Sequence, residues 1–429
     1  MDYGRDADAP GACVLKNQIN MVTLFNKSPK RRNTFIKKNA PSYLREAGIS
    51  RVKKESSGPL KLDKRIAFIG FAFMLVGLIF TYSSSAFDSS AFFKRQLVFD
   101  LMGLAAALFL SQTYDKLQKL KIFRPMNLMY ATWVLLIIVL FTRQQANVHR
   151  WIDFGFFKLQ PSEIAKVTLV IFTADYLDKV SGKLAKNWKL LIKPIAVAGV
   201  TLGLILAEKD IGTPTLMGAV FVFMLLVAGA RMLHLALPAI VISPLVIHQL
   251  FFVGYRRERI FSFLNPFETA GSTGYQLVQS FLAVGSGGWF GKGLGNSELK
   301  LEYLPAAHTD FIFSIMCEEF GLFRAAFIIG GFCWLLIRGI SLARVAKTTF
   351  HSLVIFGLTI TICMQAFFNM AMAIGLLPTK GIALPFFSYG GSSVIMTLVM
   401  MGIILNMAAV DHTQNNLRED ITNYKNRNK

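Results

Sequence analysis

The sequence predicts an all-α, polytopic membrane protein of about ten transmembrane helices with one large extracytoplasmic loop. Hydrophobic residues make up 53% of the 429-residue chain, charged residues only 17%, and the mean hydropathy is +0.47. Apolar runs of about 20 residues recur from Ile66 onward, and a helix of that length crosses the hydrocarbon core of a bilayer.

The expected helices follow these apolar runs, and an even number of them places both termini on one side of the membrane. The chain then divides into a basic cytoplasmic tail (1–65), a membrane domain (66–410) and a cytoplasmic C-terminal tail (411–429). The helices are expected at 66–84, 97–112, 126–142, 161–177, 190–207, 213–229, 232–254, 311–337, 350–377 and 388–410.

The distribution of charge predicts the orientation. The formal net charge is +21, and much of the excess lies in the first 65 residues and in alternate connections between helices. By the positive-inside rule, both termini are cytoplasmic. The polar N-terminal tail has no sustained apolar run, so we expect it to be disordered and see no signal-peptide pattern. No aromatic-rich basic module accompanies the charge, which argues against nucleic-acid binding.

One connection on the opposite side is too long for a simple turn. It covers about 255–310 and is rich in glycine, polar residues and aromatic side chains. The aromatic content predicts an ordered loop that lies against the membrane surface. Its GSGGWFGKGLGNS stretch (285–297) matches no Walker pattern and follows no strand, so nucleotide binding is rejected.

Several ionisable residues lie in or beside the expected spans, where they are costly unless they have a partner or a function. Glu163 and Lys166 are neighbours on one helix face, as an ion pair or as groups that orient an anionic substrate. Asp210 stands before the next helix, and capping explains it better than catalysis. Arg150, beside Trp151, is a candidate phosphate ligand.

Cations on the outer side need a reason, because the orientation rule disfavours them. Arg256, Arg257 and Arg259 begin the large loop, where they meet either lipid headgroups or an anionic lipid-linked ligand. Near the end of the chain, GLLPTKGIALPFFSYGGSS (375–393) interrupts the helical pattern with Pro and Gly. Non-helical backbone at membrane depth is buried in protein or lines a cavity. The histidines and cysteines show no metal-ligand spacing.

Four stretches carry a specific resemblance that covers about residues 66–410. They are RWI and LQPSEIAK within 150–166, KDIGT (209–213), the segment from GYQLVQ to CEEFG (274–321), and LPTKGIALPFFSYGGSS (377–393). These stretches resemble the SEDS family of bacterial shape, elongation, division and sporulation proteins. The GNS, KLEYLP, HTDFIF, PTKG and SYGGSS patterns resemble the division branch more than the elongation branch.

The resemblance implies a ten-helix peptidoglycan glycosyltransferase. Such a protein joins the disaccharide units of lipid II at the outer face of the bacterial cytoplasmic membrane, here at the division septum. The implied partners are a class B penicillin-binding protein, which is a transpeptidase, and other membrane proteins of the division complex. The essential acid of the HTDFIF motif falls on Asp310, and the family's QPSE and Lys positions fall on Glu163 and Lys166. Further substrate-binding candidates within the matching stretches are Gln279, Ser388 and Tyr389.

The chain departs from the family pattern at several positions near these motifs. Lys209 stands where the family usually has Pro, and Ala306 where it often has Glu after Leu-Pro. Arg324 replaces a small residue, while Val148 and His149 alter the lead-in to Arg-Trp. Lys209 and Ala306 bear on the electrostatics of the outer cavity.

The expected mechanism is general base catalysis by Asp310 on the 4-hydroxyl of the acceptor GlcNAc. Cations from the candidates above, or a divalent cation such as Mg or Mn, would stabilise the leaving pyrophosphate. On a helix, Glu318 and Glu319 would lie about 12 Å or more beyond Asp310, too far for a glycosidase-like carboxylate pair. We therefore interpret Glu318 and Glu319 as helix-packing groups, with Arg324 as a loose counter-charge.

Two other functions fit the same features. A flippase or transporter for lipid-linked oligosaccharide would also need membrane acids and bases, but it would form no glycan strands. A non-catalytic division scaffold would use the basic tail for docking, and Ala306 is the residue that most favours it.

Overall fold

The computed structural model describes residues 62–85, 90–142, 150–155, 157–184, 187–236, 240, 254–298, 309–346 and 348–427. Side chains are described in these ranges except at 84–91, 254–256 and 410–427. The tail over 1–61, most of the expected helix at 232–254, and Val148, His149 and Ala306 therefore lie outside the described residues.

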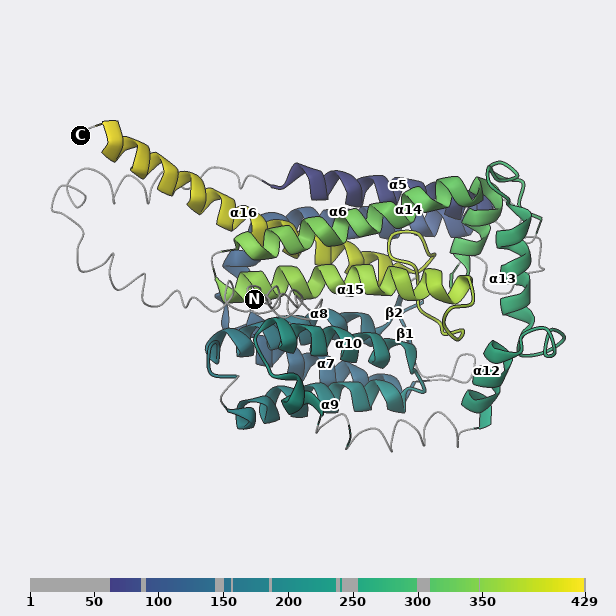
Figure 1. Ribbon diagram of the computed structural model, residues 1–429, viewed down its shortest axis with the longest axis horizontal. Coiled ribbons are helices and arrows are strands. Elements are labelled where there is room, and N and C mark those ends of the chain that lie inside the picture. The colour runs from purple at the N-terminus through teal and green to yellow at the C-terminus, as the bar shows by residue number, and fades with distance from the viewer. Residues whose placement is uncertain are drawn as a thin grey trace, which may run out of the picture.

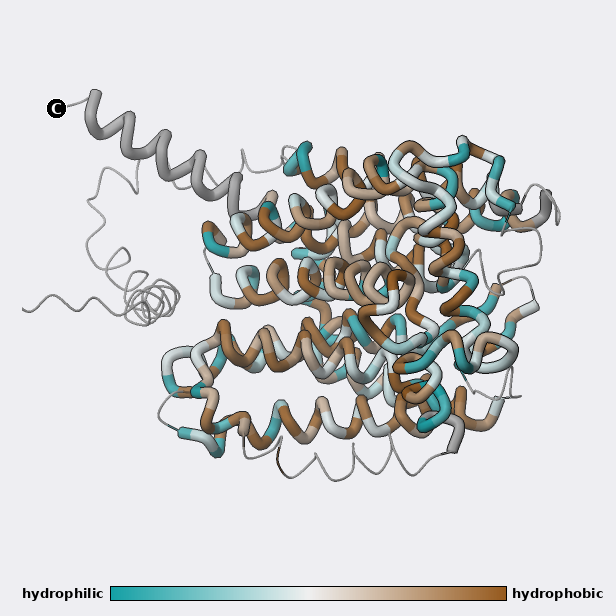
Figure 2. Tube along the Cα trace, turned by 45° about the vertical axis from the view of Figure 1, so that its right-hand side comes forward, coloured by the Kyte–Doolittle hydropathy of each residue, from teal (hydrophilic) through white to brown (hydrophobic). Residues whose placement is uncertain are grey.

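Nine long helices run side by side as one bundle (Figure 1) within the described part of the chain. They are α5 (Lys64–Ser85), α6 (Ser90–Leu117), α7 (Pro125–Leu140), α8 (Pro161–Lys179), α9 (Ile192–Ala207), α10 (Gly212–Val227), α14 (Ile312–Val345), α15 (Thr349–Ala373) and α16 (Gly391–Arg427). Apolar residues cover the helices along their length, and hydrophilic residues gather toward the two ends of the bundle (Figure 2). This is the pattern of a bundle that spans a membrane.

Short elements complete the chain. A two-stranded antiparallel hairpin pairs β1 (Ile152–Asp153) with β2 (Lys158–Leu159), and 3₁₀ turns cover Lys121–Phe123 and Trp188–Leu191. The loop helices α12 (Gly254–Leu264) and α13 (Tyr275–Ser286) lie across the end of the bundle opposite the C-terminus (Figure 1). The large loop is thus ordered where it is described, as its aromatic content predicts.

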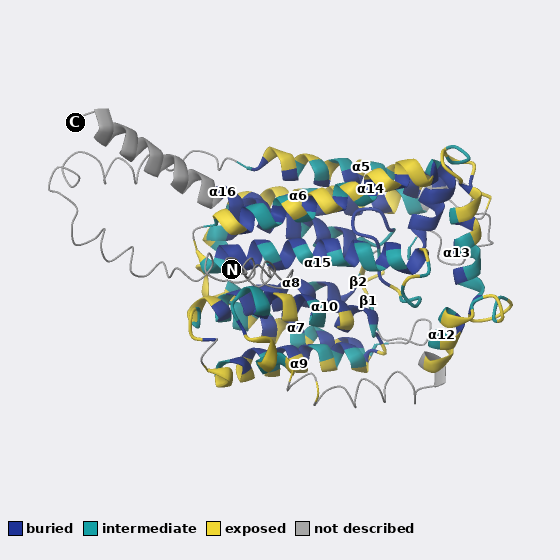
Figure 3. Ribbon diagram, viewed as in Figure 1, coloured by how far each residue is buried: buried dark blue, intermediate teal, exposed yellow. Residues whose placement is uncertain are grey.

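Helices α8, α15 and α16 are the most buried, while α5, α6, α9 and α14 expose one apolar face (Figure 3). Small residues let the central helices approach closely. A Cβ at Gly402 of α16 would stand 2.5 Å from the Ala107 carbonyl oxygen of α6, so only glycine allows that contact. The exposed faces suit contact with lipid, whose tails are as apolar as leucine.

The fold class predicted from the sequence is confirmed. Six described helices are long and apolar enough to cross a membrane, and α7 and α10 are shorter apolar helices. The helix boundaries differ at both ends of the domain. Helix α6 begins at Ser90 rather than at 97, and α16 continues to Arg427 rather than ending at 410.

The Gly-rich stretch of the large loop packs on an interruption in α14. At Gly321 the backbone leaves the helical region, with φ 76° and ψ 169°. There the loop and α14 pair like strands: Lys292 N donates to Glu318 O at 2.9 Å, and Leu322 N donates to Gly288 O at 2.9 Å. A Cβ at Gly291 would collide with the Glu319 backbone. The glycines therefore serve backbone packing.

Candidate active site

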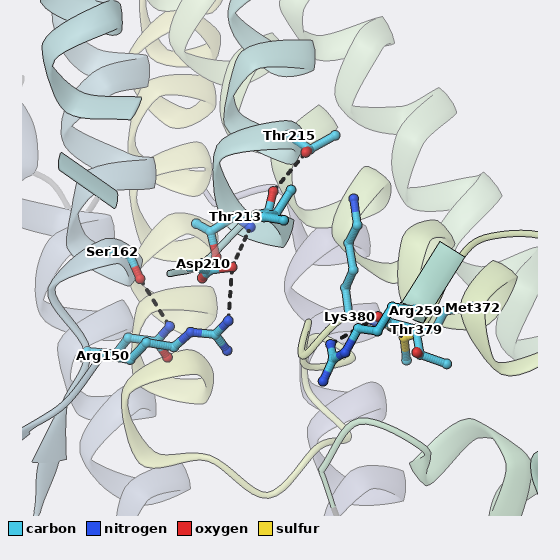
Figure 4. A network of polar contacts seen from close by, with 11 residues as sticks. Arg150, Ser162, Asp210, Thr213, Thr215, Arg259, Met372, Thr379 and Lys380 are labelled. Carbon is cyan, nitrogen blue, oxygen red and sulfur yellow. Dashed lines mark hydrogen bonds and ion pairs between the residues drawn. The ribbon is translucent and has the colours of Figure 1, made fainter. Parts of the chain in front are cut away.

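Four segments meet at the end of the bundle that carries α12 and α13. They are the hairpin that leads from Arg150 into α8, the turn between α9 and α10, the residues before α14, and the non-helical segment between α15 and α16. Figure 4 shows Arg150 approaching from one side and Arg259 with Lys380 from the other. The polar side chains of the site therefore come from segments that are distant in the sequence.

Arg150 is fixed by Asp210. Arg150 Nη2 lies 3.2 Å from Asp210 Oδ1, and the Asp210 side chain is only 1% exposed (Figure 4). Asp210 also accepts hydrogen bonds from Thr213 Oγ1 at 2.7 Å and from Thr213 N at 3.4 Å. Asp210 therefore caps the start of α10, as predicted, and holds the guanidinium of Arg150 as well.

Asp310 lies just before α14 and is partly buried. Within the described residues, its carboxylate forms no hydrogen bond or ion pair. The pKa of Asp310 is raised to about 6, chiefly by burial; the charges of Arg150 and Arg259 oppose the rise, and the charge of Asp210 adds to it. A carboxylate with this pKa is mostly ionised at neutral pH and still accepts a proton readily.

The backbone around Asp310 is held by buried side chains. Asn369 Nδ2 on α15 donates to Asp310 O at 2.7 Å and to Ile382 O at 2.8 Å. Ser388 Oγ donates to Thr309 O at 2.5 Å and accepts from Leu384 N at 2.7 Å. These contacts fasten the chain before α14 to the non-helical segment between α15 and α16.

Glu163 and Lys166 form the predicted ion pair, with Lys166 Nζ 2.8 Å from Glu163 Oε2. The Lys166 side chain is 2% exposed, and its ammonium also donates to Gln365 Oε1 at 2.5 Å. Gln365 Nε2 in turn donates to Ala383 O at 2.9 Å. The ion pair is therefore linked, through the side-chain amide of Gln365, to the non-helical segment between α15 and α16. Gln365 lies one turn before Asn369 on α15.

Two further cations belong to this end of the bundle: Arg259 acts on Asp310, and Lys380 lies near Asp210. Arg259 on α12 donates from Nη1 to Thr379 O at 3.2 Å, and it lowers the pKa of Asp310. Burial lowers the pKa of Lys380, and the charge of Asp210 opposes that change. Arg257 is exposed, and the side chain of Arg256 lies outside the described residues. Of the three loop arginines, the structure thus brings Arg259 to the site.

Three substrate-binding candidates remain: Gln279, Tyr389 and Ser388. Within the described residues, their side chains form no hydrogen bond with the side chains of Asp310, Arg150, Arg259 or Lys380. Gln279 lies on α13 and is half-buried. Tyr389 packs edge-on against Phe92, with ring centroids 5.2 Å apart. Ser388 is buried in the backbone contacts given above, so its hydroxyl holds the segment rather than facing outward.

Glu208 is a buried acid beside Asp210 that has no polar partner among the described residues. Burial and the neighbouring charge of Asp210 raise the pKa of Glu208 to about 9, and Arg150 opposes the rise. Glu208 is therefore a neutral carboxylic acid at physiological pH. Lys209, which departs from the family pattern, lies between Glu208 and Asp210. Its φ is 66°, a left-handed backbone conformation that residues other than glycine rarely adopt.

Glu318 and Glu319 are fully buried and bonded to protein groups, in line with the packing role predicted for them. Glu318 contacts Lys292 Nζ at 3.0 Å and accepts from Ser297 Oγ at 2.5 Å. Ser83 of α5 donates to Glu319 Oε1 at 2.7 Å. The predicted counter-charge Arg324 was wrong: it donates to Phe290 O at 2.9 Å, and Lys292 is the cation at Glu318.

The described residues offer no ready-made cage of protein ligands for a divalent cation. Among the described residues, no three His, Cys, Asp or Glu side chains come close enough together to hold a metal ion. Asp210 is already bound to Arg150 and Thr213.

Three residues of the site, Gln365, Asn369 and Lys380, were not predicted from the sequence. Gln365 and Asn369 are four residues apart, so they share one face of α15, and this polar pair inside an apolar run was a usable signal. Lys380 lies in the PTKG motif but was considered only as part of a helix break. Its position beside Asp210 depends on contacts between distant segments, which spacing does not reveal.

The comparisons with known proteins agree with this architecture. Residues 63–413 match the FtsW/RodA/SpoVE family, described as "Cell cycle protein". A relative from Geobacter metallireducens, named "Probable peptidoglycan glycosyltransferase FtsW", is 37% identical over 81% of this chain and 95% of its own. Relatives with the same name from Saccharophagus degradans and Legionella pneumophila are 38% and 35% identical, over 77% and 87% of this chain and 88% and 95% of their own.

Two solved structures share the fold. A chain of the structure described as "Structural coordination of polymerization and crosslinking by a peptidoglycan synthase complex" matches with a TM-score of 0.70 and 25% identity, over 82% of this chain and 99% of that one. The rod shape determining protein RodA of Thermus thermophilus matches with a TM-score of 0.61 and 24% identity, over 81% and 97%. The second likeness concerns the fold alone.

The fold and the site together define a multi-pass helical membrane protein with a charged site at one end of its bundle. The chain belongs to the SEDS family, the family of FtsW, RodA and SpoVE.

Proposed function

We propose that this protein is a peptidoglycan glycosyltransferase, which polymerises lipid II into glycan strands at the outer face of the cytoplasmic membrane during cell division. Its membership of the family and the names of its relatives support the reaction class. The observation that carries the proposal is Asp310, a carboxylate that no described residue neutralises by direct contact although cations surround it.

Asp310 acts as the general base in this proposal. The 4-hydroxyl oxygen of the acceptor GlcNAc attacks the anomeric carbon of the donor sugar, and its proton passes to Asp310. The bond from that carbon to the pyrophosphate oxygen breaks, and the lipid pyrophosphate leaves with the bonding electrons. A placed base contributes about 10²–10⁴-fold to such a step.

Three cations are positioned to stabilise the leaving pyrophosphate. Arg150, Arg259 and Lys380 come from three different segments (Figure 4): Arg150 and Arg259 act on Asp310, and Lys380 lies near Asp210. Fixed charges in a partly buried site stabilise developing negative charge without having to reorganise during the reaction. The low exposure of Lys166 supports its role in holding the non-helical segment, one step removed from substrate.

The proposal includes a transpeptidase partner of the penicillin-binding class and a place at the division septum. The solved complex that combines polymerization with crosslinking supports such a partner, because this chain shares its fold with one member. The division role rests on the relatives named FtsW.

Purified protein in lipid bilayers, incubated with lipid II with and without the partner, tests the proposal. We expect glycan strands from the wild type and a rate of strand formation about 10²–10⁴-fold lower from the Asp310→Asn variant. Translocation of lipid II without strand formation would instead show a flippase, and strands from Asp310→Asn at the wild-type rate would remove Asp310 from the chemistry.

A further inference from the structure

The SYGGSS stretch (388–393), where α16 begins, binds two segments of the site through two buried serines. Ser388 is 1% exposed and Ser392 is 2% exposed. Ser388 Oγ donates to Thr309 O, in the segment before α14. Ser392 Oγ donates to Lys158 O at 2.7 Å and accepts from Gln160 N at 3.0 Å. One short stretch of chain therefore bonds the backbone of two segments that are distant from each other in the sequence.

The strand that Ser392 binds belongs to the hairpin that follows Arg150. Strand β2 pairs antiparallel with β1, and Leu159 of β2 lies opposite Ile152 of β1. Ile152 follows Arg150 by two residues, so the position of the hairpin determines where the arginine leaves the backbone. Ser392 therefore holds the segment of Arg150 against α16, as Ser388 holds the segment before α14.

The side chains carried by these two segments meet beside Gly381. A Cβ on Gly381 would stand 3.1 Å from Arg150 Nη1 and 3.3 Å from Asp310 Oδ2, so both side chains approach the backbone of this glycine. The charge of Arg150 also opposes the rise in the pKa of Asp310. The spacing between the carboxylate and the guanidinium therefore depends on how firmly the two segments are held.

The turn between the two serines is packed on α6. Gly390 N donates to Gln96 Oε1 at 3.4 Å, and a Cβ on Gly391 would lie 3.0 Å from the ring of Phe99. A side chain at Gly391 would therefore push on α6. Because the turn is fixed in this way, a segment that is bonded to one serine is also fixed relative to the segment that is bonded to the other.

We propose that Ser388 and Ser392 are paired positioning residues, which hold the Asp310 segment and the Arg150 hairpin on one fixed turn and so set the spacing between the base and its neighbouring cation. This inference rests on the proposed glycosyltransferase function, and it adds two residues that act through others. The two serines work as a unit, because the spacing is lost when either segment is released. Residues that work as a unit show losses of rate that do not multiply.

The variants Ser388→Ala and Ser392→Ala, alone and combined, test this pairing, and Ser393→Ala is the matched control. Ser393 is the next residue on α16 and is also buried, but its hydroxyl forms no hydrogen bond with any described residue. The readouts are the turnover number and the KM for lipid II polymerisation, measured per amount of folded protein. Thermal unfolding of each variant supplies the folded fraction.

We expect each single alanine variant to lower the turnover number by about tenfold, because small displacements of reacting groups have large effects on rate. The double variant should also lose about tenfold rather than the product of the two losses, about 100-fold. The KM for lipid II should stay at the wild-type value, and Ser393→Ala should match the wild type in both constants. If an alanine variant does not fold, the corresponding Ser→Cys variant replaces it, because a thiol is a weaker donor and acceptor than a hydroxyl.

A wild-type turnover number in the alanine or cysteine variants would overturn the positioning role and leave the proposed function standing. Losses that multiply in the double variant would overturn the pairing, because independent loosening of two segments gives that result. A raised KM with an unchanged turnover number would overturn it as well, since it would place the serines in substrate binding. A wild-type protein that forms no strands would overturn the proposed function itself.

Discussion

Asp310 and the pair Glu318–Glu319 lie within ten residues of one another, yet their surroundings are opposite. The two glutamates are fully buried, and each is bonded to side chains of another segment. Asp310 is partly exposed, and within the described residues its carboxylate has no bonded partner. A buried carboxylate that is hydrogen-bonded to neighbouring segments has a structural role. A carboxylate that has no bonded partner and lies near cations is available for reaction.

The largest difference between the two regions should appear when both acids become amides. Asp310→Asn removes the proton acceptor, and we expect the polymerisation rate to fall by about 10²–10⁴-fold. Glu319→Gln keeps an oxygen that can accept from Ser83, so its rate should stay close to the wild-type value. Rate assays on both variants with lipid II check this, and equal losses would erase the distinction.

A larger change at Glu318 should act on stability. Glu318→Ala removes the acceptor for Lys292, Ser297 and the Glu298 backbone N–H, so the Gly-rich loop loses its side-chain anchor on α14. We expect the free energy of unfolding to fall by about 2 kcal/mol. Thermal unfolding and protease cleavage within 287–298 measure the effect. An unchanged midpoint and an uncleaved loop would show that backbone pairing alone holds the loop.

Two buried asparagines offer a finer version of the comparison. Asn369 bonds two carbonyls beside Asp310, and Asn406 makes a similar pair of backbone contacts, to Ser111 O and Asp115 N, in the tight α6–α16 interface. Both Asn→Ala variants should lose similar stability. Only Asn369→Ala should lower the polymerisation rate of the folded protein, by about tenfold, because it loosens the base. Equal rates in the two variants would reduce Asn369 to a packing residue.

Much of the fold could be predicted from the sequence because membrane helices have a strong signal. Long apolar runs located α5, α14 and α15, and the Gly-Pro pattern located the non-helical segment before α16. The start of α6 was not predicted because Lys94, Arg95 and Gln96 interrupt the apolar run there. Helical structure there follows from packing on the rest of the bundle, which local composition does not record.

The site was predictable in part. Arg150 and Arg259 lie near Asp310, as their predicted common role suggested, whereas Asp210 was predicted only as a helix cap and also binds Arg150. The assignment of Arg324 to Glu318 was wrong because the Gly321 interruption redirects the chain and brings Lys292 to that acid. The contacts of Gln365 and Asn369 join segments that are distant in sequence, so single-sequence spacing gave no distance between them.

The dependence of the polymerisation rate on pH tests the central claim, that Asp310 is the general base, most directly. The pKa of Asp310 is raised to about 6, and a base works only when deprotonated. The wild-type rate should therefore rise with pH through about 6 and level off above it, and the residual rate of Asp310→Asn should lack this rise. A rise near pH 6 that persists unchanged in Asp310→Asn would contradict the account.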